Sequence, residues 1–154
     1  MRRWRSYEEA HADLSALEPA DRLPVLLEVW RGETSTLDYD EVRRLFILAW
    51  ADGQVPTEHD HEVLGMLRWI APVRDPEQYL VGTLTIYRGA DGDDRSIRWT
   101  LDEERAAMHP EARGIHRATV KAHHVLAHLT AGGKNHVLVD PHEIENVELV
   151  QSTG

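Results

Sequence analysis

The chain has no cysteine among its 154 residues. Disulfide bonds and thiolate metal sites are therefore excluded, which fits a reducing compartment such as the cytoplasm. Basic residues are also scarce, since 17 Lys and Arg against 27 Asp and Glu give a net charge of -10. General nucleic-acid binding needs clustered basic side chains, so this balance argues against it. We expect a cytoplasmic protein without general nucleic-acid binding.

Long apolar runs are missing as well, so we expect no membrane span and no membrane partner. The sequence contains no GxSxG, HExxH, GxGxxG or P-loop motif, and these absences disfavour several common enzyme classes. A hydrophobic content of 42% with 29% charged residues is typical of a globular protein. The length predicts one domain over residues 1–154, with a helical part at 1–72, a β part at 82–150 and a connection at 71–81.

The first part shows helical periodicity. Ser6 followed by Glu9 predicts an N-terminal capping box. Asp21 is a candidate cap for a second helix that ends at Gly32, with Pro24 in its first turn. A third helix is predicted from Asp38 or Asp40 through Trp50, ending at Gly53, and a fourth from Thr57 or Asp60 to the residue before Pro72. The third helix is apolar on nearly every side around Phe46 and Trp50, so we expect it to be buried.

The second part is rich in β-branched residues in alternating patterns, which predicts strands. The expected strands are Thr83–Arg88, Ser96–Leu101, Gly114–Lys121, His124–Leu129, Asn135–Val139 and Asn146–Val150. Turns are predicted at residues 91–94 and 131–133, and a short helix over Glu103 to Met108, capped by Asp102 and ended by Pro110.

The strand at Thr83–Arg88 leads into a Tyr-Arg-Gly sequence, and ten residues later comes Arg98-Trp99-Thr100. An arginine at the end of a strand presents a rigid guanidinium that suits phosphate or ribose oxygens. Together with Gly133–Pro141, these segments resemble the ADP-ribosyltransferase fold. The resemblance is greatest to small phage and actinobacterial members that carry YRG, SWT and a glutamate before a VxVDP strand, and it covers Thr83 to Val150.

This resemblance implies an α+β fold in which an N-terminal helical layer packs on an ADP-ribosyltransferase-like β core of two sheets. It also implies NAD as the substrate that donates the ADP-ribose. Arg88 would hold this cofactor, and Tyr87, Gly89, Trp99 and Thr100 would line its pocket. This chain departs from the family pattern at two positions, because Arg98 replaces the serine of SWT and His136 stands where the glutamate is expected.

The loss of the glutamate matters chemically because ADP-ribosyl transfer develops positive charge on the ribose, which a carboxylate stabilises. Two functions therefore remain open. In the first, the chain is an NAD-dependent mono-ADP-ribosyltransferase-like protein with His136 in the catalytic position and a protein as acceptor. In the second, it is a catalytically inactive pseudoenzyme that binds a protein partner and inhibits or regulates it. Arg98 either grips a pyrophosphate beside Arg88 or forms a surface pair near the acidic turn. Trp99 is either core or pocket wall.

Histidines are numerous, and the densest groups are at residues 59–61 and 123–128. His124 and His128 would have a zinc-binding spacing on a helix. No third ligand can be named, so we predict no metal site.

Overall fold

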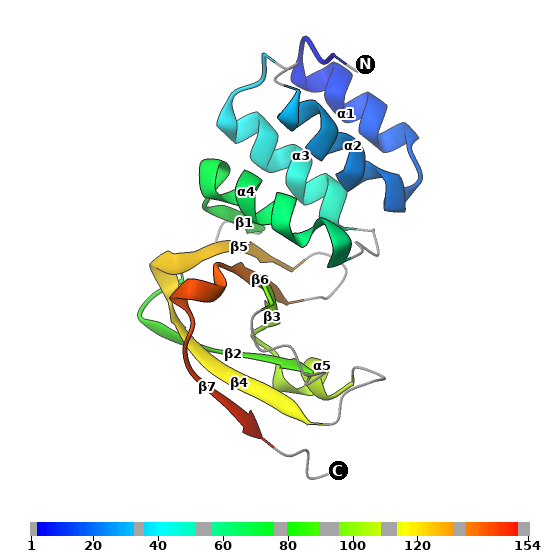
Figure 1. The fold of residues 1–154 in the computed structure, drawn as a ribbon. Coiled ribbons are helices and arrows are strands. Elements are labelled where there is room, and N and C mark those ends of the chain that lie inside the picture. Colours follow the sequence, from blue (N-terminus) through cyan, green and yellow to red (C-terminus); the bar gives the residue numbers. More distant parts are fainter. Residues whose placement is uncertain are drawn as a thin grey trace. The chain divides into compact units, whose positions relative to one another are not determined.

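The computed structural model describes residues 3–32, 36–51, 57–75, 80–89, 96–108, 114–130 and 135–150. The chain divides between Val73 and Arg74 into a helical unit and a unit that contains a β-sheet (Figure 1). This division falls inside the predicted connection at residues 71–81. The fold class is α+β, as predicted. The predicted helix ends at Gly53 and Pro110 and the turns at 91–94 and 131–133 lie outside the described residues.

The helices of the first unit follow the predicted order. Their bounds are α1 (Tyr7–Ala16), α2 (Pro19–Arg31), α3 (Tyr39–Ala51), the short 3-10 turn η1 (Thr57–His59) and α4 (Asp60–Ile70). Their apolar faces form the core of this unit. The buried side chains are Ala10, Leu14, Leu23, Leu26, Leu27, Val29, Val42, Leu45, Phe46, Ala49, Trp50, Val63, Met66, Leu67 and Ile70. The predicted burial of Phe46 and Trp50 is confirmed, with 0% and 5% of their surfaces exposed.

Two helix starts are stabilised by side-chain caps. The Ser6 hydroxyl accepts a hydrogen bond from the Glu9 amide at 3.1 Å, which confirms the predicted cap of α1. At the start of α3, Asp38 Oδ1 accepts from the Glu41 amide at 2.8 Å, and Glu41 Oε1 accepts from the Asp38 amide at 3.1 Å. This reciprocal pair of bonds satisfies two amides that the helix itself leaves without partners.

The predicted start of α2 is wrong by three residues, since the cap is Glu18 and not Asp21. The helix begins at Pro19 rather than after Asp21, because proline at the first helical position has a suitable φ angle and needs no amide hydrogen. Pro24 therefore lies inside the helix and not in its first turn. The predicted end is confirmed, since Gly32 is the C-terminal cap of α2.

The second unit contains the β-sheet. The strands are β1 (Val73–Asp75), β2 (Thr83–Gly89), β3 (Arg98–Thr100), β4 (Ile115–Lys121), β5 (Val125–Leu129), β6 (His136–Val139) and β7 (Glu145–Val150). A short helix α5 (Glu103–Ala107) follows β3, and 3-10 turns η2 (Ala122–His124) and η4 (Pro141–Glu143) precede β5 and β7. The predicted cap is confirmed, because Asp102 accepts a hydrogen bond from the Glu104 amide.

The sheet has the order β1-β5-β6-β3-β2-β4-β7 (Figure 1). This order places β3 between β2 and β6, and β6 is far from both in the sequence. The register between β2 and β3 rests on the pair Tyr87 and Thr100, whereas β2 and β4 are paired along seven residues. One face of the sheet carries an apolar cluster from five strands. Its buried members are Ile86, Trp99, Ala118, Val120, Val125, Val137 and Val139.

Strand β1 was not predicted, since residues 71–81 were expected to be a connection. Its three residues are held in place by hydrogen bonds to β5 and to the residue that follows β5. The Arg74 guanidinium donates to the Val125 carbonyl at 3.0 Å, and burial lowers the pKa of Arg74. The Asp75 carbonyl accepts from both the amide and the hydroxyl of Thr130. A strand this short has too few residues for an alternating pattern to reveal it.

Candidate functional site

Residues from the three motif segments lie opposite one another across adjacent strands. His136 of β6 is paired with Thr100 of β3, which is paired with Tyr87 of β2. The same line continues through Arg117 of β4 to Glu148 of β7. We call these five residues the cross-strand row. The strands that carry Arg88 and Thr100, β2 and β3, are therefore neighbours in the sheet.

Strand alternation divides the predicted site residues between the two faces of the sheet. Directly paired residues of antiparallel strands point to the same face, and successive residues point to opposite faces. The row therefore shares a face with Gly89 and Arg98, which lie two residues from Tyr87 and Thr100. We call this the polar face, although it also carries the buried Leu138, which is paired with Arg98.

Arg88 and Trp99 lie on the other face, together with the apolar cluster. The Arg88 Cζ is 6.0 Å from the centroid of the Trp99 ring, and the Nε and Nη1 atoms of Arg88 are buried. The expectation that His136 and Arg88 face one pocket is therefore wrong. A joint grip of pyrophosphate by Arg88 and Arg98 is excluded for the same reason, because the two side chains leave the sheet on opposite sides.

Trp99 is part of the core. Its side chain is 2% exposed, and the indole Nε1 donates to the Ser96 carbonyl at 2.8 Å. Of the two interpretations of this residue, the structure supports the one that makes it core. Its burial also explains why Arg88, stacked over it, is held against the apolar face.

Thr100 connects three elements at the centre of the row. Its hydroxyl donates to the Asn135 carbonyl at 2.9 Å and accepts from the Asp102 amide at 3.0 Å. The first bond joins β3 to the start of β6, and the second fixes the residue that caps α5. Asn135 is itself held, since its Oδ1 lies 2.7 Å from Nε2 of the buried His128. Thr100 is 7% exposed, so its main role in this position is structural.

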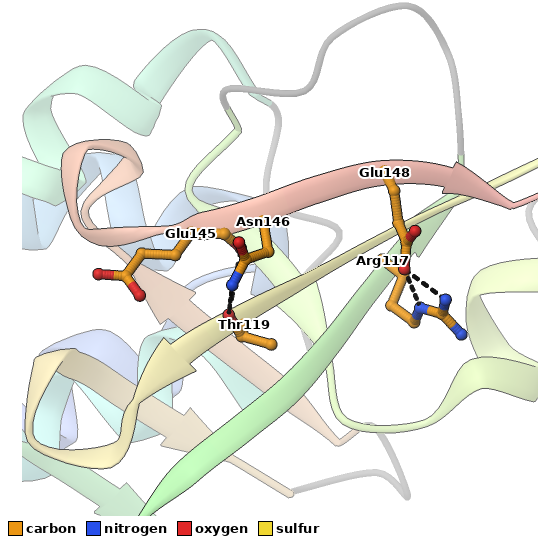
Figure 2. Close-up of polar contacts among 5 residues, drawn as sticks. All are labelled: Arg117, Thr119, Glu145, Asn146 and Glu148. Atoms are coloured by element: carbon orange, nitrogen blue, oxygen red, sulfur yellow. Dashed lines mark hydrogen bonds and ion pairs between the residues drawn. The ribbon is translucent and has the colours of Figure 1, made fainter.

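Arg117 and Glu148 form an ion pair at the far end of the row, and sequence reasoning did not find it (Figure 2). The Arg117 Nε donates to Glu148 Oε1 at 2.7 Å, and Nη2 donates to the same oxygen. This hydrogen bond and the charge of Glu148 raise the pKa of Arg117, with smaller contributions from Tyr87 and Glu103. The sequence of β4 or of β7 alone does not show that Arg117 and Glu148 are paired, because the register between the two strands depends on the folded sheet.

The histidines do not form a metal site among the described residues. His124 Nδ1 lies 3.2 Å from Glu143 Oε2, and His59 Nε2 lies 3.7 Å from Glu58 Oε1. Each of these two histidines therefore lies near a single carboxylate. His124 belongs to the turn η2 and His128 to β5, so the helical spacing that would favour zinc is not formed.

No family profile, curated protein or solved structure matches the chain. In the described residues, none of the helices has the length and apolar character needed to cross a membrane.

Proposed function

We propose that the chain is an NAD-binding, mono-ADP-ribosyltransferase-like protein whose cofactor lies on the polar face of β6, β3 and β2. The observation that carries this proposal is the row His136–Thr100–Tyr87, because three motif segments far apart in the sequence meet on adjacent strands in one register. The polar face also carries Arg98, which supplies a cation for a pyrophosphate.

This assignment changes the role of the two arginines. The resemblance gives the cofactor to Arg88, but that guanidinium is stacked over Trp99 on the apolar face. Arg98, at the position of the family serine, leaves the sheet beside Thr100 and on the side of His136. We therefore assign the phosphate contact to Arg98 and a packing role to Arg88.

The family's two-sheet core is compatible with this strand order. The joint between β2 and β3 rests on one registered pair, so the sheet would divide there into β1-β5-β6-β3 and β2-β4-β7. Such a division would place the NAD site at the seam, where Tyr87 and Thr100 meet.

Catalysis at this site would be weak. Cleavage of the nicotinamide–ribose bond builds positive charge on the ribose, and an imidazole cannot stabilise that charge as a carboxylate does. His136 accepts a hydrogen bond when neutral and opposes the charge when protonated. The carboxylate in the same row, Glu148, is four strand spacings from His136, or roughly 19 Å. It is also engaged by Arg117.

A second candidate function is a pseudoenzyme that binds a protein partner. The separation of Arg88 from His136 favours it, because the arginine and the catalytic position of the family pattern do not meet on one face. In this case NAD would not bind, and the strands would act as a scaffold.

Calorimetric titration of NAD separates these candidates. Wild-type protein should bind NAD, and Arg98→Met should weaken that affinity about tenfold through loss of a charge-assisted contact. Arg88→Met is the matched control, since it makes the same change on the next strand but on the opposite face. Equal affinities for the two variants would refute the assignment to the polar face. No heat of binding with wild type at millimolar NAD would refute NAD binding itself and leave the pseudoenzyme.

A further inference from the structure

Strand β7 forms one edge of the sheet, since it ends the strand order and is paired with β4 along its inner side (Figure 1). No other strand of the described residues is paired with its outer side. An edge of this kind presents backbone amides and carbonyls that can pair with an added strand. Residues 145–149 are exposed and Val150 is half-buried.

The two edges of the sheet differ in how they are protected. β1, at the other edge, has three residues, with Val73 buried and Arg74 and Asp75 bonded to their neighbours. β7 has neither lysine nor proline, and its charged residues are Glu145 and Glu148. Its irregularity is confined to its start, where Asn146 has a positive φ of 56° and the register shifts between Arg117 and Thr119. Its last three residues are paired in regular register.

The shift gives β7 two chemically different faces. Glu145 and Glu148 are paired with Thr119 and Arg117, and the Glu148 carboxylate binds Arg117 on the polar face, whereas the Glu145 side chain extends away from Thr119 (Figure 2). Asn146 also reaches that side, where its Nδ2 donates to Thr119 Oγ1 at 3.2 Å. On the opposite face Val147 and Leu149 are 40% and 63% exposed. Apolar side chains with this much exposed surface, next to unpaired backbone groups, are suited to contact with another strand.

Charge decides between the occupants of this edge. A second copy of the chain would bring Glu145 and Glu148 toward their own counterparts, on two molecules that each carry a net charge of -10. Like charges on neighbouring strands are destabilising, whereas opposite charges attract. A basic segment would instead gain from Glu145 and from the net charge of -10, because Glu148 is already engaged by Arg117.

We propose that the β7 edge binds an extended protein segment of alternating apolar and basic residues by strand addition. Its backbone pairs with Val147–Val150, its apolar residues contact Val147 and Leu149, and its basic residues lie close to Glu145, since Glu148 is already engaged by Arg117. This mode obtains affinity from main-chain hydrogen bonds and selectivity from alternate side chains. The inference does not depend on NAD binding.

The test uses a short fluorescein-labelled peptide that alternates valine and lysine, with fluorescence anisotropy as the readout. A peptide with glutamate in place of lysine is the first control. The protein variants are Val147→Lys at the edge and Val81→Lys as its matched control. Val81 is also an exposed valine of the second unit, with 77% of its surface exposed, but it lies outside β7. Thermal unfolding curves, recorded by circular dichroism, verify that both variants are folded.

We expect the lysine peptide to bind wild type and Val81→Lys alike, and Val147→Lys to bind it about tenfold more weakly. Added salt should weaken binding because the attraction is between exposed charges. Equal affinity for the glutamate peptide would overturn the charge assignment. If Val147→Lys and Val81→Lys bind the lysine peptide with equal affinity, the assignment of the site to β7 is wrong. The proposal is also wrong if wild type does not bind the lysine peptide at millimolar concentration. A dimer in sedimentation that Val147→Lys dissociates would show that a second copy occupies the edge instead.

Discussion

The guanidinium of Arg88 lies over the indole of Trp99, with Cζ 6.0 Å from the ring centroid. Trp99 is buried in the apolar cluster, and strand alternation places Arg88 on that same face, which His136 does not share. Arg98, one residue before Trp99, leaves the sheet on the side of His136. The two arginines of the motif segments are therefore separated by the sheet itself.

Arg88 should act on stability rather than on cofactor affinity. We expect Arg88→Met to lower the free energy of unfolding by about 1–2 kcal/mol through loss of the contact with Trp99. Urea denaturation measures this change. Arg98→Met makes the same substitution on the polar face and should affect stability less. A larger loss for Arg98→Met than for Arg88→Met would contradict the packing role.

His136 should limit turnover. Wild-type protein is expected to release little or no nicotinamide from NAD, because His136 and not a carboxylate stands at the start of β6, where the positive ribose would need to be stabilised. His136→Glu supplies one, and nicotinamide release measured by chromatography should rise above the wild-type level. The double variant with Arg98→Ser restores the family pattern at both positions. It also removes the guanidinium that we propose as the phosphate contact, so the affinity for NAD should fall while the turnover per bound NAD rises. Wild-type turnover that survives His136→Ala would contradict this account.

The Thr100 hydroxyl should stabilise the junction of β3, β6 and α5. Thr100→Val removes the donor to the Asn135 carbonyl and the acceptor of the Asp102 amide, at a cost of about 1–3 kcal/mol in the free energy of unfolding. Thr85→Val is the matched control, because Thr85 is an exposed threonine of β2, and its change should be within about 0.5 kcal/mol. Both values follow from urea denaturation, and equal losses would remove the special role of Thr100.

Phe46 should carry a large share of the helical unit's stability. It is fully buried and stacked on Trp50, with ring centroids 5.7 Å apart. We expect Phe46→Ala to cost about 3–5 kcal/mol, because it leaves a cavity as well as removing apolar contacts. Phe46→Leu keeps most of the volume and should cost less. Differential scanning calorimetry tests the pair, and a loss below about 1 kcal/mol for Phe46→Ala would place this helix face at a surface.

Much of the local structure was determined by the sequence itself. Ser6 with Glu9, Gly32 and Asp102 marked helix ends because caps act on backbone groups within a few residues. The apolar spacing around Phe46 predicted burial for the same reason, since one helix turn brings those side chains together. Alternating β-branched residues predicted six of the seven strands that the structure describes in the sheet.

The candidate site depended on the tertiary structure. Tyr87, Thr100 and His136 could be singled out by resemblance, but which of them share a face with Arg88 or Arg98 depends on strand register. A shift of one residue would exchange the two faces, and no local pattern in β3, a strand of three residues, specifies that register. The pair Arg117–Glu148 and the open edge of β7 have the same origin, because both follow from the order in which distant strands pair. Side-chain alternation is a local property of the chain, whereas strand order is set by the burial of the whole sheet's apolar face.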